Sequence, residues 1–174
     1  MLSFAFFRSL GITPGPVEQG DSCERADVLT FKTTPLEAEE RISGAVSLTL
    51  SVASTAPDTA FVARLISEHD GKAVLIREAA ATLAFPTAEA LTRQTYTPGT
   101  PTKVQLDFWP IEWVLPKGAR LRVDVTSSSF PVVHTHSNRA GPWATQTGAD
   151  VATQTVRVGE DRSVLSVPLA PRSN

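Results

Sequence analysis

Residues 106–131, LDFWPIEWVLPKGARLRVDVTSSSFP, decide the fold, because two apolar–polar alternations flank a turn in this stretch. Residues 106–109 alternate as a half-buried strand does, and residues 120–128 do so again, with leucine and valine on one face. Pro110 predicts the end of the first strand, since proline has no N–H to donate to a strand ladder. Residues 113–115 then predict a short extended piece before a Pro-Lys-Gly turn. The stretch therefore predicts two core strands of an antiparallel sandwich, joined by a short edge piece and a tight turn.

Short segments with strand character recur along the rest of the chain, roughly every ten residues. Residues 46–52 show a period of two most clearly, with valine and leucine on one face and serine and threonine on the other. The pair Asp70-Gly71 predicts a hairpin turn. The other predicted strands are 28–33, 61–67, 72–77, 102–109, 154–158 and 164–168, with residues 159–162 as a hairpin turn between the last two. About eight or nine short strands predict an all-β fold, a jelly-roll β-sandwich.

Composition and charge argue against several classes of partner. A chain of 174 residues is most economically one domain. A net charge of −2 gives no general attraction to nucleic acid or anionic membrane, and no segment approaches the roughly 18 apolar residues that span a bilayer. Arg8 follows the apolar start instead of preceding it, which disfavours a signal peptide. Cys23, the single cysteine, cannot form an intrachain disulfide and is interpreted as an incidental thiol. We therefore expect a cytoplasmic domain without nucleic-acid or membrane partners.

Five segments in a fixed order resemble the C-terminal domain of X-Pro dipeptidyl-peptidases, cocaine-esterase-like serine hydrolases and α-amino-acid ester hydrolases. They are 27–36, 43–50, 56–65, 106–131 and 152–156. The resemblance implies a galactose-binding-domain-like jelly roll that is not catalytic itself. It also implies that the domain packs on an α/β-hydrolase catalytic domain, shapes the substrate pocket and contributes to assembly. On this basis we expect an irregular lead-in over residues 1–20, the jelly-roll domain over 21–171 and a tail over 172–174.

Residues 78–94 give conflicting local signals. The segment is rich in alanine, which has high helix propensity. Pro86 lies in its middle and would cost about 3 kcal/mol inside a helix. Following the resemblance, we expect a strand to about residue 85 and then a loop to residue 99.

The chain shows no catalytic constellation, so no catalytic residue is predicted. It contains no G-x-S-x-G elbow and no βαβ succession to hold one. Ser22 follows Gly20 and Asp21 as in GDS-type lipases, but no aspartate stands three residues before any histidine, so we interpret it as part of a turn. Ser127, Ser128 and Ser129 are interpreted as a strand end whose hydroxyls cap backbone groups, since no base is assigned to them.

His134 and His136 are weak candidates for a metal site, because their spacing puts both imidazoles on one side of an extended segment. A third ligand would have to come from His69, Asp150 or elsewhere, and no spacing rule points to one. An exposed loop pair is the plainer interpretation, and zinc or copper the alternative. No metal and no cofactor is predicted. The family's motif in this loop survives only at its front and at Asn138, which makes Asn138 a candidate interface residue.

The three tryptophans, Trp109, Trp113 and Trp143, are the strongest candidates for a ligand or interface surface. Core or interdomain packing is one interpretation, because each indole can bury 150–250 Å² in general. Stacking on sugar rings is the alternative, and it would make the chain a carbohydrate-binding module. Asp58 is a further candidate, either bonded to a turn or, with Asp107, binding a structural calcium. The predicted partner is an α/β-hydrolase domain or a second copy of the chain; the rivals are the carbohydrate-binding module and an independent hydrolase with a cryptic site.

Overall fold

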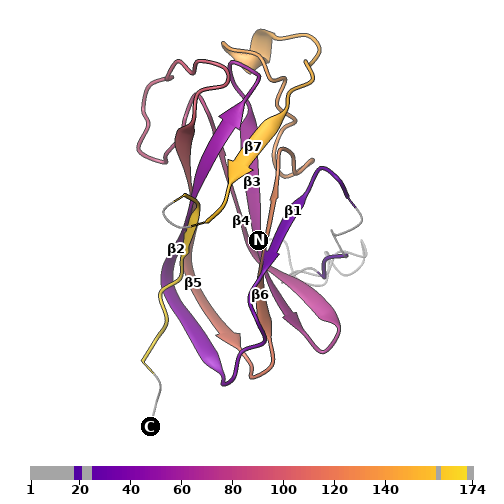
Figure 1. The fold of residues 1–174 in the computed structure, drawn as a ribbon, viewed down its shortest axis with the longest axis vertical. Coiled ribbons are helices and arrows are strands. Elements are labelled where there is room, and N and C mark those ends of the chain that lie inside the picture. Colours follow the sequence, from indigo (N-terminus) through magenta and orange to yellow (C-terminus); the bar gives the residue numbers. More distant parts are fainter. Residues whose placement is uncertain (1–17, 21–24, 160–161, 172–174) are drawn as a thin grey trace, which may run out of the picture.

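The computed structural model describes residues 18–20, 25–159 and 162–171, and it shows two antiparallel sheets packed face to face (Figure 1). The predictions for residues 1–17 and 172–174, and for Ser22 and Cys23, lie outside the described residues. No helix in the described ranges is long and apolar enough to cross a membrane. One sheet has the order β1 (Leu29–Lys32), β6 (Arg120–Thr126), β3 (Ala60–His69), β4 (Lys72–Thr82). The other has the order β5 (Thr102–Leu115), β2 (Glu40–Ser54), β7 (Gln154–Arg157), with β8 (Val164–Ser166) also paired to β2. The predicted all-β jelly-roll sandwich is confirmed, because most connections cross from one sheet to the other.

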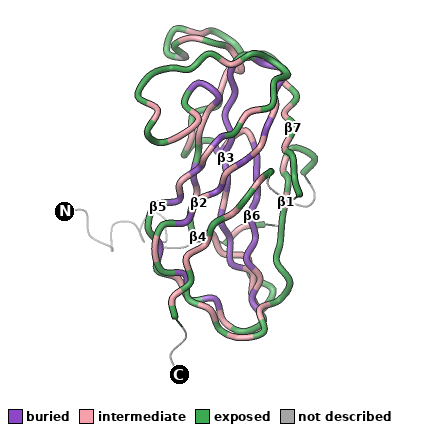
Figure 2. Tube along the Cα trace, turned by 60° about the vertical axis from the view of Figure 1, so that its left-hand side comes forward, coloured by how far each residue is buried: buried purple, intermediate pink, exposed green. Residues whose placement is uncertain are grey.

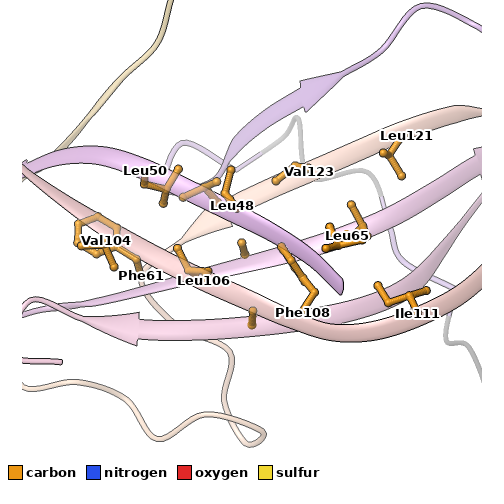
Figure 3. Close-up of a cluster of buried hydrophobic side chains, with 14 of the residues drawn as sticks. Leu48, Leu50, Phe61, Leu65, Val104, Leu106, Phe108, Ile111, Leu121 and Val123 are labelled. Atoms are coloured by element: carbon orange, nitrogen blue, oxygen red, sulfur yellow. The ribbon is translucent and has the colours of Figure 1, made fainter. Parts of the chain in front are cut away.

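The core lies between the sheets and is built from the inward residues of alternating strands (Figure 3). Leu48 and Leu50 of β2 face Phe61 and Leu65 of β3 across this layer, and Phe108 of β5 is fully buried beside them. Burying a side chain of this kind contributes about 1.5–3 kcal/mol relative to leaving it exposed. The period of two in the sequence therefore determines which residues of each strand form the core.

A β-bulge in β5 corrects the predicted break at Pro110. The strand runs without interruption through Pro110, which pairs with Ala45, while Asp107 pairs with Ser47. Two residues, Phe108 and Trp109, thus oppose one residue of β2, and the proline is tolerated because β5 is an edge strand. The extra residue shifts the alternation, so the residues that follow at 111, 113 and 115 turn toward the core. Residues 113–115 are the end of β5 and not a separate piece.

The hairpin turns were predicted with mixed success. Asp70 and Gly71 both have positive φ, at 48° and 74°, and join β3 to β4 as predicted. The predicted hairpin at 159–162 is wrong, because β7 and β8 both pair antiparallel with β2 and follow each other along its edge. Strand β4 ends at Thr82, so the prediction of strand and then loop over 78–99 is confirmed.

Strand β6 is buried on both faces, although the alternation suggested a polar outer face. Arg122 and Asp124 are 1% and 2% exposed. Arg122 donates to Asp124 at 2.6 and 2.8 Å and to Glu68 at 3.0 Å. Thr30 donates to Asp124 at 2.8 Å, and Lys32 pairs with Glu68 at 2.8 Å. Hydrogen bonding to Asp124 raises the pKa of the Arg122 guanidinium, and its charge is retained in the buried network.

Candidate functional site

A cleft of about 550 Å³ lies beside strands β4 and β5, and five of the residues singled out in the sequence line it. We call it the β4–β5 cleft. The loops that follow β4 and β6, residues 83–101 and 127–153, lie at the same end of the sandwich (Figure 1) and are largely exposed along their length (Figure 2). The lining residues that the argument uses are Asp58, Glu78, Phe85, Arg93, Asp107, Trp109, His134 and His136.

Asp58 contacts both loops that line the cleft. Its side chain is 3% exposed, and its Oδ1 accepts a hydrogen bond from the backbone N–H of Ala84 at 3.0 Å. Its Oδ2 accepts from Arg93 at 3.0 Å and lies 3.5 Å from Nε2 of His136. Burial by itself raises the pKa of the Asp58 carboxyl, but hydrogen bonds from His136, Ala84 and Arg93 outweigh it and hold the pKa below its usual value. The carboxylate therefore links two loops that are distant from it in the sequence.

His136 uses both ring nitrogens within the fold. Its Nδ1 accepts the backbone N–H of Asn138 at 3.0 Å, so this nitrogen carries no proton. Its Nε2, which faces the Asp58 carboxylate, then carries the proton. Neither nitrogen has a lone pair left for a metal ion or for taking a proton from a substrate unless these contacts break.

Two other residues considered as metal ligands, His69 and Asp150, have charged neighbours of their own. His69 sits at the β3–β4 turn, with its Nδ1 3.3 Å from Asp70, and Asp150 pairs with Arg139 at 2.7 Å. Within the described ranges, no group of three or more His, Cys, Asp or Glu side chains is placed to hold a metal ion. His134 lines the cleft on the exposed side of the loop.

The three tryptophans occupy three different settings. Trp109 lines the cleft and is 77% exposed, with φ at 57° in the left-handed region. Trp113 packs half-buried against the core, where its Nε1 is buried and has no hydrogen-bond partner among the described residues. Trp143 begins the short 3-10 helix η2 (Trp143–Thr145), and its side chain is not among those described. Trp109 is thus the tryptophan that the structure presents at the cleft.

Asn138 holds the loop behind the cleft. It has φ at 63°, a region that asparagine tolerates better than most residues. Its Oδ1 accepts a hydrogen bond from Thr59 at 2.7 Å, and its Nδ2 donates to the carbonyl of Asp150, also at 2.7 Å. Asn138 therefore positions His136 from behind and does not line the cleft itself.

Sequence reasoning missed three residues of the cleft, Phe85, Arg93 and Glu78. Arg93 stacks over the ring of Phe85, with its guanidinium carbon 5.3 Å from the ring centre. Glu78 accepts from Arg64 at 2.9 Å and from Ser129 at 2.6 Å, so Ser129 bonds to a side chain and does not cap the backbone. Arg93 could have been noticed as a charged residue in the alanine-rich segment around Pro86. No feature of the neighbouring sequence indicated that it would contact Phe85 and Asp58.

The fold and the cleft define an all-β sandwich domain of the jelly-roll class. The chain belongs to the family of X-Pro dipeptidyl-peptidase C-terminal non-catalytic domains, whose model matches residues 14–164. It is 31% identical over 146 residues to the cocaine esterase of Rhodococcus sp. (strain MB1 Bresler), which covers 83% of this chain and 25% of that protein. Membership in a non-catalytic family agrees with the prediction that the chain has no catalytic residue of its own.

Solved structures support the same placement. An α-amino acid ester hydrolase superposes with a TM-score of 0.77 at 25% identity, over 85% of this chain and 26% of that one. An aminopeptidase from a marine sediment Thaumarchaeota archaeon superposes with a TM-score of 0.76 at 19% identity, over 86% and 27%, which shows the likeness of fold. The chain spans about a quarter of the length of these relatives.

Proposed function

We propose that this domain docks through the β4–β5 cleft onto the α/β-hydrolase catalytic domain of an acyl esterase or peptidase and helps to shape its substrate pocket. Family membership supports a non-catalytic role. The relatives that it matches extend over about four times the matched length, which supports a larger hydrolase as the setting in which the domain works.

The exposure of Trp109 carries this proposal. Burying a side chain of this size contributes several kcal/mol of favourable free energy. Trp109 is nevertheless 77% exposed in the isolated domain. Its φ of 57° costs about 1–2 kcal/mol for a residue with a Cβ, and such strain is concentrated at functional sites in general.

Further exposed apolar side chains are close in sequence to residues that line the cleft. Leu91, Phe130 and Val132 are 93%, 76% and 80% exposed, and each is within three residues of a residue that lines the cleft. Exposed apolar side chains near a hollow are typical of a docking surface. A partner domain that covers the two loops would bury these side chains.

The names of the relatives support one class of partner. A cocaine esterase and an α-amino acid ester hydrolase both act on esters, and the archaeal relative is named an aminopeptidase. We infer that the partner of this domain cleaves an acyl ester or a peptide bond and that its own residues perform the chemistry.

The test is association with a related catalytic domain. The Rhodococcus cocaine esterase, trimmed of the quarter that this chain matches, would be titrated with the chain in a calorimeter. We expect a one-to-one complex that Trp109→Ala weakens about tenfold, or 1.4 kcal/mol. The excised quarter of the esterase, added in the same way, is the positive control. Binding of that quarter without binding of this chain would contradict the proposal, as would a complex that is indifferent to Trp109→Ala.

Carbohydrate binding is a second candidate, and the surroundings of Trp109 favour it. The exposed indole shares the cleft with Gln105 and Asp107, and an aromatic ring beside amide and carboxylate groups can stack on and hydrogen-bond a sugar. The predicted likeness of the fold to galactose-binding domains is an analogy of fold that would accord with this candidate. Retention on immobilised polysaccharide that Trp109→Ala abolishes would support it over docking.

A further inference from the structure

The β4–β5 cleft contains one complete arginine site built from its own residues. The guanidinium of Arg93 stacks on the ring of Phe85 and donates to the carboxylate of Asp58 at 3.0 Å. An aromatic face and a carboxylate together suit a guanidinium, because its plane stacks on the ring while its N–H groups donate to oxygen.

The same pair of groups occurs a second time in the cleft without a cation. Asp107 and Trp109 both line it from β5, two residues apart on one side of the strand. Asp107 accepts a hydrogen bond from the side chain of Gln105 at 2.9 Å through Oδ1. Among the described residues it makes no ion pair, and its Oδ2 accepts no hydrogen bond. Its charge is therefore not neutralised within the described part of the chain.

The other two carboxylates of the cleft are already paired with arginines of the domain. Asp58 is paired with Arg93, and Glu78 is paired with Arg64 at 2.9 Å, so neither cation is available to Asp107. One oxygen of Glu78, Oε1, is buried without a hydrogen-bond donor in the described ranges. A buried acceptor without a donor is destabilising, so Glu78 retains Arg64 in its present pairing.

We propose that Asp107 and Trp109 form the receptor for an arginine side chain presented by the docked hydrolase domain. This inference rests on the proposed function and names the chemistry of the contact. Arginine fits better than lysine, because its planar guanidinium can lie on the indole and donate to Asp107 at the same time. The bulge supports the geometry, since Trp109 is 77% exposed and lines the same cleft as Asp107 while Phe108 stays in the core.

The test uses two peptides of nearly the same shape, acetyl-Leu-Arg-Leu-amide and its citrulline counterpart, in which a neutral ureido group replaces the guanidinium, titrated into the full 174-residue chain. Binding is followed by NMR through the indole N–H of Trp109 and the amides of residues 105–109. We expect the arginine peptide to bind about tenfold more tightly than the citrulline peptide, and to weaken with salt as an exposed ion pair does. Asp107→Asn, which keeps the shape of the side chain, should remove that preference.

A matched control lies on the same strand outside the cleft. Glu112 forms an exposed pair with Arg41, and Glu112→Gln should leave the arginine preference intact. Equal affinity for the two peptides, no binding of the arginine peptide up to about 10 mM, or a preference that survives Asp107→Asn would overturn the proposal.

The association experiment with the trimmed esterase separates this inference from the proposed function. A complex that forms equally well with Asp107→Asn, but is weakened by Trp109→Ala, would refute the arginine contact and leave docking intact. Absence of any complex, while the positive control binds, would refute docking itself.

Discussion

The carboxylate of Asp58 lies 3.5 Å from Nε2 of His136 and joins two loops that are far apart in the chain. The same carboxylate accepts from Ala84 and Arg93, so its removal leaves several donors without an acceptor in a buried place. Breaking a buried pair by removing one partner costs about 3–5 kcal/mol. Because Arg93 keeps access to water, we expect about 2–4 kcal/mol for Asp58→Ala, measured by urea unfolding. Asp70→Asn, at an 86% exposed side chain, should stay within about 0.5 kcal/mol; equal effects of the two changes would contradict the structural role of Asp58.

The depressed pKa of Asp58 predicts a pH dependence of stability. A carboxyl whose pKa is lower in the folded protein than in the unfolded chain contributes stability above its unfolded value, about 3.9, and loses it as the pH falls. We expect the free energy of unfolding to fall between about pH 5 and pH 3, and to fall less steeply in Asp58→Asn. Urea unfolding at several pH values checks this difference in slope. Parallel curves for the two proteins would show that Asp58 does not titrate differently on folding.

The strands could be predicted because most of them alternate apolar and polar residues with a period of two. Residues 46–52 and 120–126 alternate in sequence, and the faces that carry valine and leucine do line the core. The bulge at Phe108 and Trp109 could not be predicted, since no glycine marks the left-handed position and Pro110 is compatible with both a strand end and an edge strand. The single extra residue then reverses which side chains face the core from Ile111 to Leu115.

The cleft could be predicted only in part for a related reason. Trp109, Asp58 and the two histidines stood out by residue type, and the fold brings them to one place. Arg93 and Phe85 did not stand out, because their roles depend on contacts with each other and with Asp58 across a loop. Likewise, the alternation in β6 correctly placed Arg122 on the face away from the core. It could not distinguish an arginine exposed to solvent from one buried in an ion-pair network.

Two arginine–carboxylate pairs of opposite burial provide a matched test of the network on β6. The side chain of Arg122 is 2% exposed and pairs with those of Asp124 at 3% and Glu68 at 19%, whereas the side chains of Arg41 and Glu112 are 58% and 59% exposed. We expect Arg122→Met to cost about 3–5 kcal/mol, because it leaves buried carboxylates without their guanidinium. Arg41→Met should cost less than about 1 kcal/mol. Chemical unfolding of both variants checks the contrast, and a cost below about 1 kcal/mol at Arg122 would mean that the network is solvated in solution.

Trp109 and Phe108 are neighbours in β5 whose substitution should have opposite effects on stability. Phe108 is fully buried, so Phe108→Ala should cost about 3–5 kcal/mol. Trp109 is 77% exposed and has φ at 57°, a region that asparagine enters more readily. Trp109→Asn should therefore leave the free energy of unfolding unchanged or raise it by up to about 1 kcal/mol, while it weakens binding to a hydrolase domain.

Urea unfolding of the two variants, with the association measurement on Trp109→Asn, decides this prediction. A variant that is stable but does not bind would mean that the indole is retained for contact with a partner at the expense of the fold. A loss of stability at Trp109 comparable with that at Phe108 would mean that the ring packs within the domain in solution, and the docking surface would then have to be sought elsewhere.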